Sequence, residues 1–316
     1  MKPKSAGAEA QITIDKAWWE HLTPTPMHKL RSEVERRLRA WCKTEYGAHW
    51  LSSAREPGGV IRVKSGQAIP DFHMMFMRNG PRFVAPQETM RPGHRCVSVG
   101  SEGYRSGKPP QADELILSPI IRIDWVADSA FLDAARRFDI NVPSSAIGEP
   151  SLLFSAPAHL LLFPSGWPKK SFVLYQHIFG EGASYPVDGY FYVGITTRSW
   201  KTRWAEHRRA MRKGSNLLFH RKLREELEGK RVTYIHHKVM AVTTDVDALY
   251  ASEEAMVRGH WKDARRLNMI PGGRAAFRYL RRAGLMNTTA KELPDDRDGA
   301  VSAWLDQHPD HNLPEI

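Results

Sequence analysis

Apolar residues recur at helical spacing near the start of the chain. Leu30, Val34, Leu38 and Trp41 fall on one face of an amphipathic run. This spacing predicts a helix over residues 27–50, with the apolar stripe directed at a core or at a second copy of the chain.

The apolar runs become shorter after residue 58. Between residues 58 and 125 they are separated by Gly, Pro and Asn, which is typical of strands joined by turns. The expected strands carry the sequences VIRV, MMFM, RFVA, CVSV and IIRIDWV. A short helix is expected over residues 131–138. The sequence therefore predicts a separate α+β N-terminal domain over residues 1–142.

Prolines interrupt the pattern over residues 143–170. They stand at Pro143, Pro150, Pro157, Pro164 and Pro168. Because proline disrupts both helices and central strands, this segment is interpreted as a linker.

Regular periodicity returns over residues 171–285, which are predicted to form a second domain. Strands are expected at 172–179, 190–196 and 232–242, and helices at 198–213, 217–227, 245–261 and 274–283. The first two strands make a hairpin, and Ser199 is the expected N-cap of the first helix. The acidic tail, residues 286–316, is expected to be disordered outside the neighbourhood of Trp304.

Charge is distributed unevenly along the chain. The net charge is +11 in total, and residues 198–231 hold 12 Lys and Arg against 4 Asp and Glu. Residues 258–282 hold 8 against 1, so the remainder of the chain is net acidic. A strongly basic segment beside an acidic remainder favours a polyanionic partner.

The cysteines and the apolar runs of the sequence predict the cellular compartment. The spacing of Cys42 and Cys96 is typical of neither a zinc site nor a disulfide framework. The first residues lack the apolar run of a secretory signal, and no stretch is long enough for a membrane span. We expect a cytoplasmic protein without membrane attachment.

One short stretch concentrates groups that suit phosphate chemistry. Tyr192-Val193-Gly194 ends a strand, and the helix after it carries Arg203 and His207. Residues four apart lie on the same face of a helix, so these two side chains are neighbours. Arginine can bind phosphate oxygens through two parallel hydrogen bonds.

The order of elements and these residues together resemble the GIY-YIG nuclease family. The resemblance covers about residues 171–275, with Val173-Leu174-Tyr175 in place of the first triplet and Tyr192-Val193-Gly194 in place of the second. The remaining family positions are matched by Thr196, Arg203, His207, Glu253 and Asn268. The first triplet keeps only its tyrosine, and the hairpin connection is long.

The resemblance implies a C-terminal domain with a small three-stranded antiparallel sheet flanked by helices. It implies a DNA endonuclease that depends on Mg²⁺ or Mn²⁺ and leaves 5′-phosphate and 3′-hydroxyl ends. The implied catalytic residues are Tyr175, Tyr192, Arg203, His207, Glu253 and Asn268, with Glu253 as the metal ligand.

Physical chemistry supports these roles. Phosphodiester hydrolysis requires an activated water and stabilisation of the charge that develops on the phosphate. Mg²⁺ commonly takes one or two protein carboxylates, and Glu253 lies on the apolar side of its helix, with Glu254 as the alternative ligand. Arg203 and the metal were expected to lower the pKa of a tyrosine, and the sequence does not decide between Tyr175 and Tyr192 as the general base.

The other residues have supporting roles. Asn268 is expected to hold the site together, and Gly194 and Gly273 to permit close backbone approach. Phosphate contacts beyond the site are expected from Lys201, Arg208, Arg212, Arg274 and Arg278.

The function favoured by the sequence is a restriction, mobile-element or defence endonuclease acting on double-stranded DNA. Two alternatives stay open: a nuclease for single-stranded DNA or RNA, and a nucleic-acid-binding protein that has lost catalysis. The N-terminal domain is expected to select targets, to form a homodimer, or to bind a partner protein.

Overall fold

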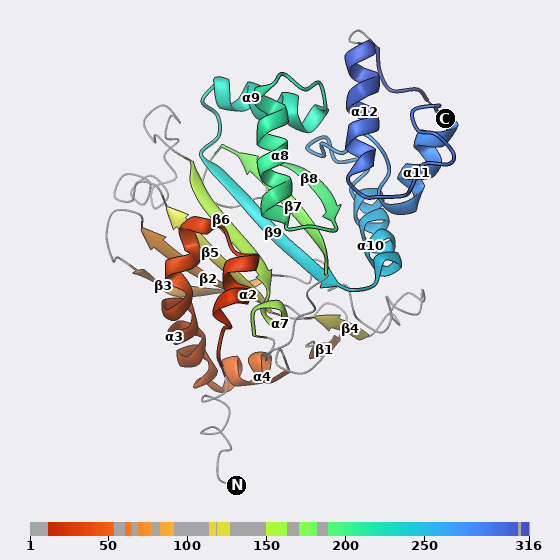
Figure 1. Cartoon of the computed structure of the whole chain (residues 1–316). Coiled ribbons are helices and arrows are strands. Elements are labelled where there is room, and N and C mark those ends of the chain that lie inside the picture. The colour runs from red at the N-terminus through yellow and green to blue at the C-terminus, as the bar shows by residue number, and fades with distance from the viewer. Residues whose placement is uncertain are drawn as a thin grey trace. The chain divides into compact units, whose positions relative to one another are not determined.

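The computed structural model has an α+β fold that divides into two compact units (Figure 1). It describes residues 12–53, 61–64, 69–77, 83–91, 114–117, 119–126, 150–162, 171–181, 189–308 and 311–315. Unit 1 comprises residues 1–126, 153–171 and 239–242, and unit 2 comprises residues 127–152, 172–238 and 243–316.

Unit 1 begins with helices whose buried faces follow the predicted stripe. They are α2 (Lys16–Leu22), the 3₁₀ helix η1 (Thr25–Leu30), α3 (Arg31–Cys42) and α4 (Glu45–Ser53). The side chains of Leu30, Val34, Leu38 and Trp41 are all buried, as the periodicity predicted. The single expected helix over 27–50 is wrong, because the run is divided into η1, α3 and α4.

The strands of unit 1 include both parallel and antiparallel pairs. They are β1 (Ile61–Lys64), β2 (Ile69–Met77), β3 (Phe83–Arg91), β4 (Glu114–Leu117), β5 (Ile120–Val126) and most of β6 (Ser151–Pro157). Strand β2 is antiparallel to β3 and parallel to β5, and β1 pairs separately with β4. The expected strand CVSV and the expected helix over 131–138 lie outside the described residues.

Unit 2 contains the predicted hairpin, β7 (Phe172–Gly180) with β8 (Tyr190–Thr196), and most of β9 (Tyr234–Thr243). Strands β7 and β8 are antiparallel, and β9 is the other neighbour of β7. The expected three-stranded antiparallel sheet is not matched, because β9 also borders β6 and the sheet is mixed. At that edge the backbone N–H of Ser151 donates to the carbonyl of Thr233 at 2.8 Å.

The helices of unit 2 lie close to their predicted positions. They are α8 (Trp200–Arg212), α9 (Leu218–Glu228), α10 (Val246–Gly259), α11 (Gly273–Arg282) and α12 (Asp296–Gln307). The Ser199 hydroxyl accepts from the Lys201 N–H at 3.2 Å, which confirms the predicted N-cap of α8. Helices α8 and α10 pack on the β7–β8 hairpin, α9 packs on α8, and α11 packs on α10 (Figure 1).

Two segments are more ordered than the sequence suggested. The described part of the expected linker forms β6 and the helix α7 (Ala158–Leu162), whose side chains are buried. The expected disordered tail contains α12, because Val301 and Leu305 pack into a cluster with Leu217 and Leu280. The tail is therefore part of the core of unit 2.

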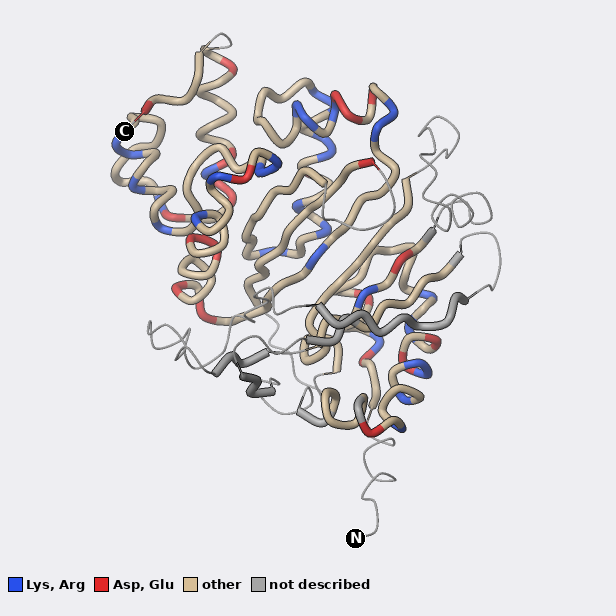
Figure 2. Tube along the Cα trace, turned by 180° about the vertical axis from the view of Figure 1, so that it is seen from behind, with Lys and Arg blue, Asp and Glu red and all other residues tan. Residues whose placement is uncertain are grey.

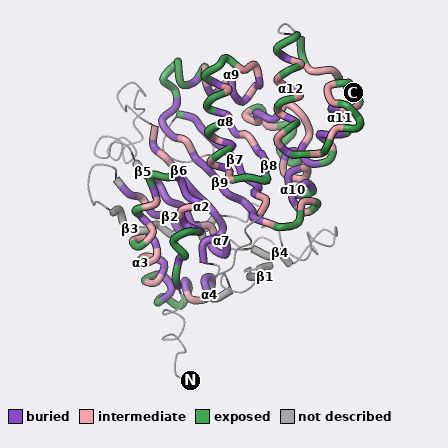
Figure 3. Tube along the Cα trace, in the orientation of Figure 1, coloured by how far each residue is buried: buried purple, intermediate pink, exposed green. Residues whose placement is uncertain are grey.

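Burial separates the strands from the helices of unit 2. Strands β7 and β9 are buried along nearly their whole length, whereas the helices keep one exposed face (Figure 3). Near the C-terminal end, Lys or Arg and Asp or Glu positions are both present (Figure 2): α11 carries Arg but no Asp or Glu, whereas α10 carries Asp247, Glu253 and Glu254. No helix in the described ranges has the length and apolar character needed to cross a membrane.

Candidate functional site

The β7–β8 register places Tyr175 directly opposite Gly194. A Cβ atom at position 194 would lie 2.6 Å from the Tyr175 hydroxyl oxygen and 2.7 Å from its Cζ atom. Glycine is therefore required for the phenol of Tyr175 to cross over β8 toward α8. The Tyr175 side chain is 1% exposed, and its hydroxyl lies 3.4 Å from Nε2 of His207.

A chain of hydrogen bonds leads from Tyr175 to the loop between α8 and α9. Nδ1 of His207 lies 2.9 Å from Nε2 of His220, and Nδ1 of His220 lies 2.8 Å from the Ser215 hydroxyl. Two opposite proton assignments satisfy every bond, since each neutral imidazole has one donor and one acceptor. In one of them Nε2 of His207 accepts from the Tyr175 hydroxyl.

Burial keeps both imidazoles neutral. It lowers the pKa of His207 to about 3, and the positive charge of Arg203 acts in the same direction. It likewise lowers the pKa of His220 to about 4. Sequence reasoning missed His220, which lies near the start of α9 against Nδ1 of the buried His207.

Arg203 lies inside a cluster of three carboxylates. Its guanidinium binds Asp298, lies 3.2 Å from Asp295 through Nε, and donates to Glu206 at 3.0 Å. Burial alone lowers the pKa of Arg203, but the charge of Asp298 and the other nearby groups outweigh it, so the pKa lies above its ordinary value. The arginine is charged and ion-paired, and its two terminal nitrogens donate to Glu206 and Asp298.

Tyr192 faces the same cluster from β8. Its hydroxyl donates to the two carboxylate oxygens of Asp298 at 3.2 and 3.1 Å. Burial raises the pKa of Tyr192, and the negative charge of Asp298 raises it further. Burial also raises the pKa of Tyr175, against the influence of Arg203. Arg203 acts on both tyrosines in the expected direction, but burial outweighs it, so the net pKa of each lies above its ordinary value.

Glu253 is buried on α10 and accepts three hydrogen bonds. Arg297 donates to both of its carboxylate oxygens, at 2.6 and 3.0 Å, and the Gly273 N–H donates at 2.7 Å. Gly273 has a φ of 57°, and a Cβ there would lie 2.2 Å from the Tyr250 carbonyl oxygen. This glycine thus brings the N-terminus of α11 against the carboxylate, where the helix dipole favours negative charge. Glu254 is partly exposed and accepts from the Ala275 N–H at 3.2 Å.

Asn268 holds β8 in place. Its amide donates to the Val193 carbonyl at 2.7 Å and accepts from the Val193 N–H at 3.0 Å. The loop before it also runs beside β8, through hydrogen bonds of Phe191 with Arg265 and Leu267. Asn268 therefore fixes the strand position between Tyr192 and Gly194 and has no amide atom directed at a reacting group.

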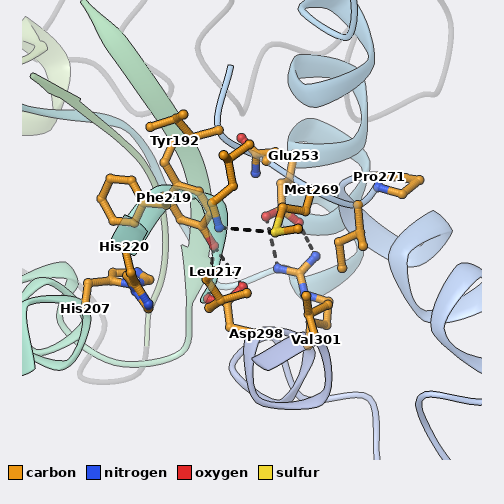
Figure 4. Close-up of a pocket in the computed structure, with 15 residues that line it drawn as sticks. Tyr192, His207, Leu217, Phe219, His220, Glu253, Met269, Pro271, Asp298 and Val301 are labelled. Atoms are coloured by element: carbon orange, nitrogen blue, oxygen red, sulfur yellow. Dashed lines mark hydrogen bonds and ion pairs between the residues drawn. The ribbon is translucent and has the colours of Figure 1, made fainter. Parts of the chain in front are cut away.

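Some of these side chains line one small cavity of about 30 Å³ (Figure 4), and Tyr175 and Arg203 are not among its lining residues. Its walls include Tyr192, His207, Glu253 and Asn268, four of the residues predicted from the sequence. His220 of α9 and Arg297 and Asp298 of α12 complete the polar part of the wall. The apolar side chains of residues 217–219 and 269–271, of Leu267 and of Val301 form the rest. In Figure 4, Glu253 and Tyr192 both make contacts with residues from α12.

The predicted phosphate-binding residues differ in their exposure to solvent and in their ion pairs. Arg208 and Arg212 are exposed one turn apart on α8. Arg274 is engaged with Asp247 at 2.5 Å and Glu292 at 2.6 Å, and Arg278 lies 3.8 Å from Glu254. Lys201 is partly buried near the start of α8.

The arrangement does not fit the divalent cation that the family resemblance implies. In the described part of the chain, no three or more His, Cys, Asp and Glu side chains are grouped to hold a metal ion. Glu253 alone offers a carboxylate at the expected position, and Arg297 occupies both of its oxygens. A cation at Glu253 requires Arg297 to move.

The contribution of α12 to the site was missed at the sequence level. Asp295, Arg297 and Asp298 lie in a segment interpreted as a disordered acidic tail. The available signal was the four-residue spacing of Val301 and Leu305, which is typical of a packed helix. A comparison with family models, with curated proteins and with solved structures finds no match.

Proposed function

We propose that unit 2 is a phosphodiesterase that acts on nucleic acid, and that it is a DNA endonuclease in the first instance. One observation carries the proposal: Tyr192, His207, Glu253 and Asn268, from four separate elements, line the same cavity. The resemblance to GIY-YIG nucleases assigns these same residues to a single site. Packing alone gives no reason for such a set to converge.

Arg203 is the group that would bind the scissile phosphate. Its guanidinium is held by carboxylates, and a phosphate presents the same pattern of oxygen acceptors. An arginine beside the phosphate stabilises the charge that develops as water attacks phosphorus and the bond to the 3′-oxygen breaks.

Proton transfer is best supported at Tyr175. Its pKa is raised, so the phenol is protonated and can act only by passing its proton on as it receives one from water. Neutral His207 provides the acceptor through Nε2, and His220 and Ser215 continue the chain. Tyr192 is the weaker candidate, because its hydroxyl is engaged with Asp298.

The test is cleavage of supercoiled plasmid by the full chain in Mg²⁺ or Mn²⁺, followed by mapping of the ends. We expect nicked or linear DNA with 5′-phosphates from the natural protein, and a loss of about 100-fold or more for Arg203→Ala. Arg36→Ala, at an exposed position on α3 outside both basic segments, is the control and should retain full activity. Undiminished cleavage by the Arg203→Ala protein would contradict the mechanism.

A second candidate function is nucleic-acid binding without catalysis. The ion pairs of Arg203 with Asp298 and of Glu253 with Arg297 favour it, because they engage the groups that hydrolysis needs. Binding of duplex DNA, single-stranded DNA or RNA with no metal-stimulated cleavage of any of them would select this function. The same panel separates a DNA nuclease from a nuclease for RNA or single strands.

A further inference from the structure

One short segment contacts the two charged groups of the site, Arg203 and Glu253. It presents carboxylates to the first and an arginine to the second. Residues 294–298, Pro-Asp-Asp-Arg-Asp, lead into and begin α12. We call them the α12 entry segment. Asp295 and Asp298 contact Arg203, while Arg297 between them contacts Glu253.

The acidic residues of this segment, Asp295 and Asp298, lie against Arg203, where a phosphate group would bind. Asp295 and Asp298 are three residues apart, so they share one side of the first helical turn. Together they engage Nε and one terminal nitrogen of Arg203, and Asp298 also accepts from the Tyr192 hydroxyl. The positive charge of Arg203 holds the pKa of Asp298 below its ordinary value although burial raises it.

The basic residue of this segment, Arg297, lies against Glu253, where a divalent cation would bind. The side chain of Arg297 is 7% exposed, and both terminal nitrogens donate to the carboxylate of Glu253, whose side chain is 2% exposed. The third nitrogen, Nε, donates to the Pro294 carbonyl at 3.0 Å. A buried arginine with a hydrogen bond from each of its three nitrogens is a built contact and differs from a chance surface pair.

We propose that the α12 entry segment is an autoinhibitory occupant of the site, with its carboxylates in place of a phosphate group and Arg297 in place of a divalent cation. The inference rests on the proposed function, since it identifies the two positions by the roles of Arg203 and Glu253. Binding of nucleic acid and of a cation then requires the segment to leave, and each ligand assists the other because both displace the same residues. This accounts for the lack of a fitting metal site among the residues that the structure describes.

The cation position is tested with Mn²⁺ alone. Its binding to the full chain is measured by electron paramagnetic resonance. Arg297→Gln frees the carboxylate of Glu253 and should raise Mn²⁺ affinity by about tenfold or more. The matched control, Arg282→Gln at an exposed position on α11, should leave the affinity unchanged. An unchanged or lower affinity in folded Arg297→Gln protein would overturn the proposal.

The phosphate position is tested separately, which keeps the proposal open to refutation if Arg297→Gln does not fold. The Asp295→Asn, Asp298→Asn double variant preserves shape and one acceptor oxygen at each position while removing both charges. It should bind a short duplex oligonucleotide about tenfold more tightly, and Arg203→Ala should cancel the gain. Asp306→Asn, exposed on the same helix, is the control. Weaker or equal binding by the double variant would show that these carboxylates do not compete with phosphate.

Cleavage measured in parallel distinguishes the two proposals. If Mn²⁺ and oligonucleotide affinities rise but no variant cleaves nucleic acid, autoinhibition stands and the nuclease assignment fails. If the natural protein cleaves DNA and neither affinity rises in the variants, the nuclease assignment stands and autoinhibition fails.

Discussion

Tyr175 reaches the site only because residue 194 has no side chain. The 2.6 Å approach of a Cβ to the phenol oxygen means that one of the two must shift if a methyl group is added. The geometry of the site therefore depends on the residue that precedes Ile195 in β8, outside the cavity itself.

We expect Gly194→Ala to lower the free energy of unfolding by about 1–3 kcal/mol, the usual cost of overpacking a core. Denaturant titration of the full chain measures the change. Gly259→Ala, at the last residue of α10, is the control, because a Cβ there meets no atom within 4 Å, and it should not lower the free energy of unfolding. Equal stability of the two variants would contradict the steric argument.

The neutral histidines make stability depend on pH. The pKa of His207 falls from its ordinary 6.5 to about 3 on folding, so the unfolded chain binds more protons between these values. Stability is fully present above about pH 6.5 and declines as the pH falls toward 3, by up to about 1.4 kcal/mol per pH unit for one such histidine.

His207→Gln should reduce this pH dependence, measured as the change in unfolding free energy between pH 7 and pH 5. His311→Gln, at an exposed position near the C-terminal end, should not. A slope that is identical in the two variants would show that His207 is not held neutral in the folded state.

At the scale of elements, α12 carries the site contacts on its first turn and its core anchor on the turns after it. Gly299 lies between them, and a Cβ at this position would meet no atom within 4 Å. A helical glycine costs about 0.5–1 kcal/mol relative to alanine, so the helix is weakest directly after the α12 entry segment.

Gly299→Ala should therefore stabilise α12 by about that amount and reduce Mn²⁺ affinity, because the entry segment is held more firmly. Ala303→Gly, exposed on the same helix, should weaken α12 and act in the opposite direction. Thermal unfolding and Mn²⁺ titration of both proteins measure the two effects. Increased Mn²⁺ affinity of the Gly299→Ala protein would contradict this view of the helix.

The sequence predicted the elements of unit 2 that have strong local signals. Ser199 before an amphipathic run located α8, and alternation located β7, β8 and β9. It did not predict β6, because flanking prolines concealed a strand whose partner, β9, is distant in the chain. Nor could it predict the contact of Arg203 with Asp298, 95 residues away, since an ion pair leaves no periodic signal.

At the scale of the whole molecule, the net charge of +11 is offset locally by ion pairs. Arg274 and Arg203 are engaged with carboxylates, whereas Arg208 and Arg212 lie exposed on α8. The free basic surface of the described residues is therefore smaller than composition suggests. We expect α8 to make the main contribution to phosphate contacts outside the cavity.

Affinity for duplex DNA should fall steeply with salt, because bound phosphates release counterions. Arg208→Gln and Arg212→Gln should each reduce the slope of log affinity against log salt by about 1. Arg36→Gln, an exposed position on α3 in unit 1, should leave the slope unchanged. Filter binding between low and physiological salt gives these slopes, and a salt-independent affinity would exclude phosphate contacts as the source of binding.

The connection of the α12 entry segment to its own site has a consequence for concentration. A tethered ligand acts at an effective concentration on the order of millimolar, set by the chain and not by the amount of protein. Dilution cannot release it, and the same five residues supplied as a free peptide would be a weak inhibitor. Specific activity should therefore not change with protein concentration. A ligand will displace the α12 entry segment only if it binds well enough to compete with a tethered group at millimolar effective concentration.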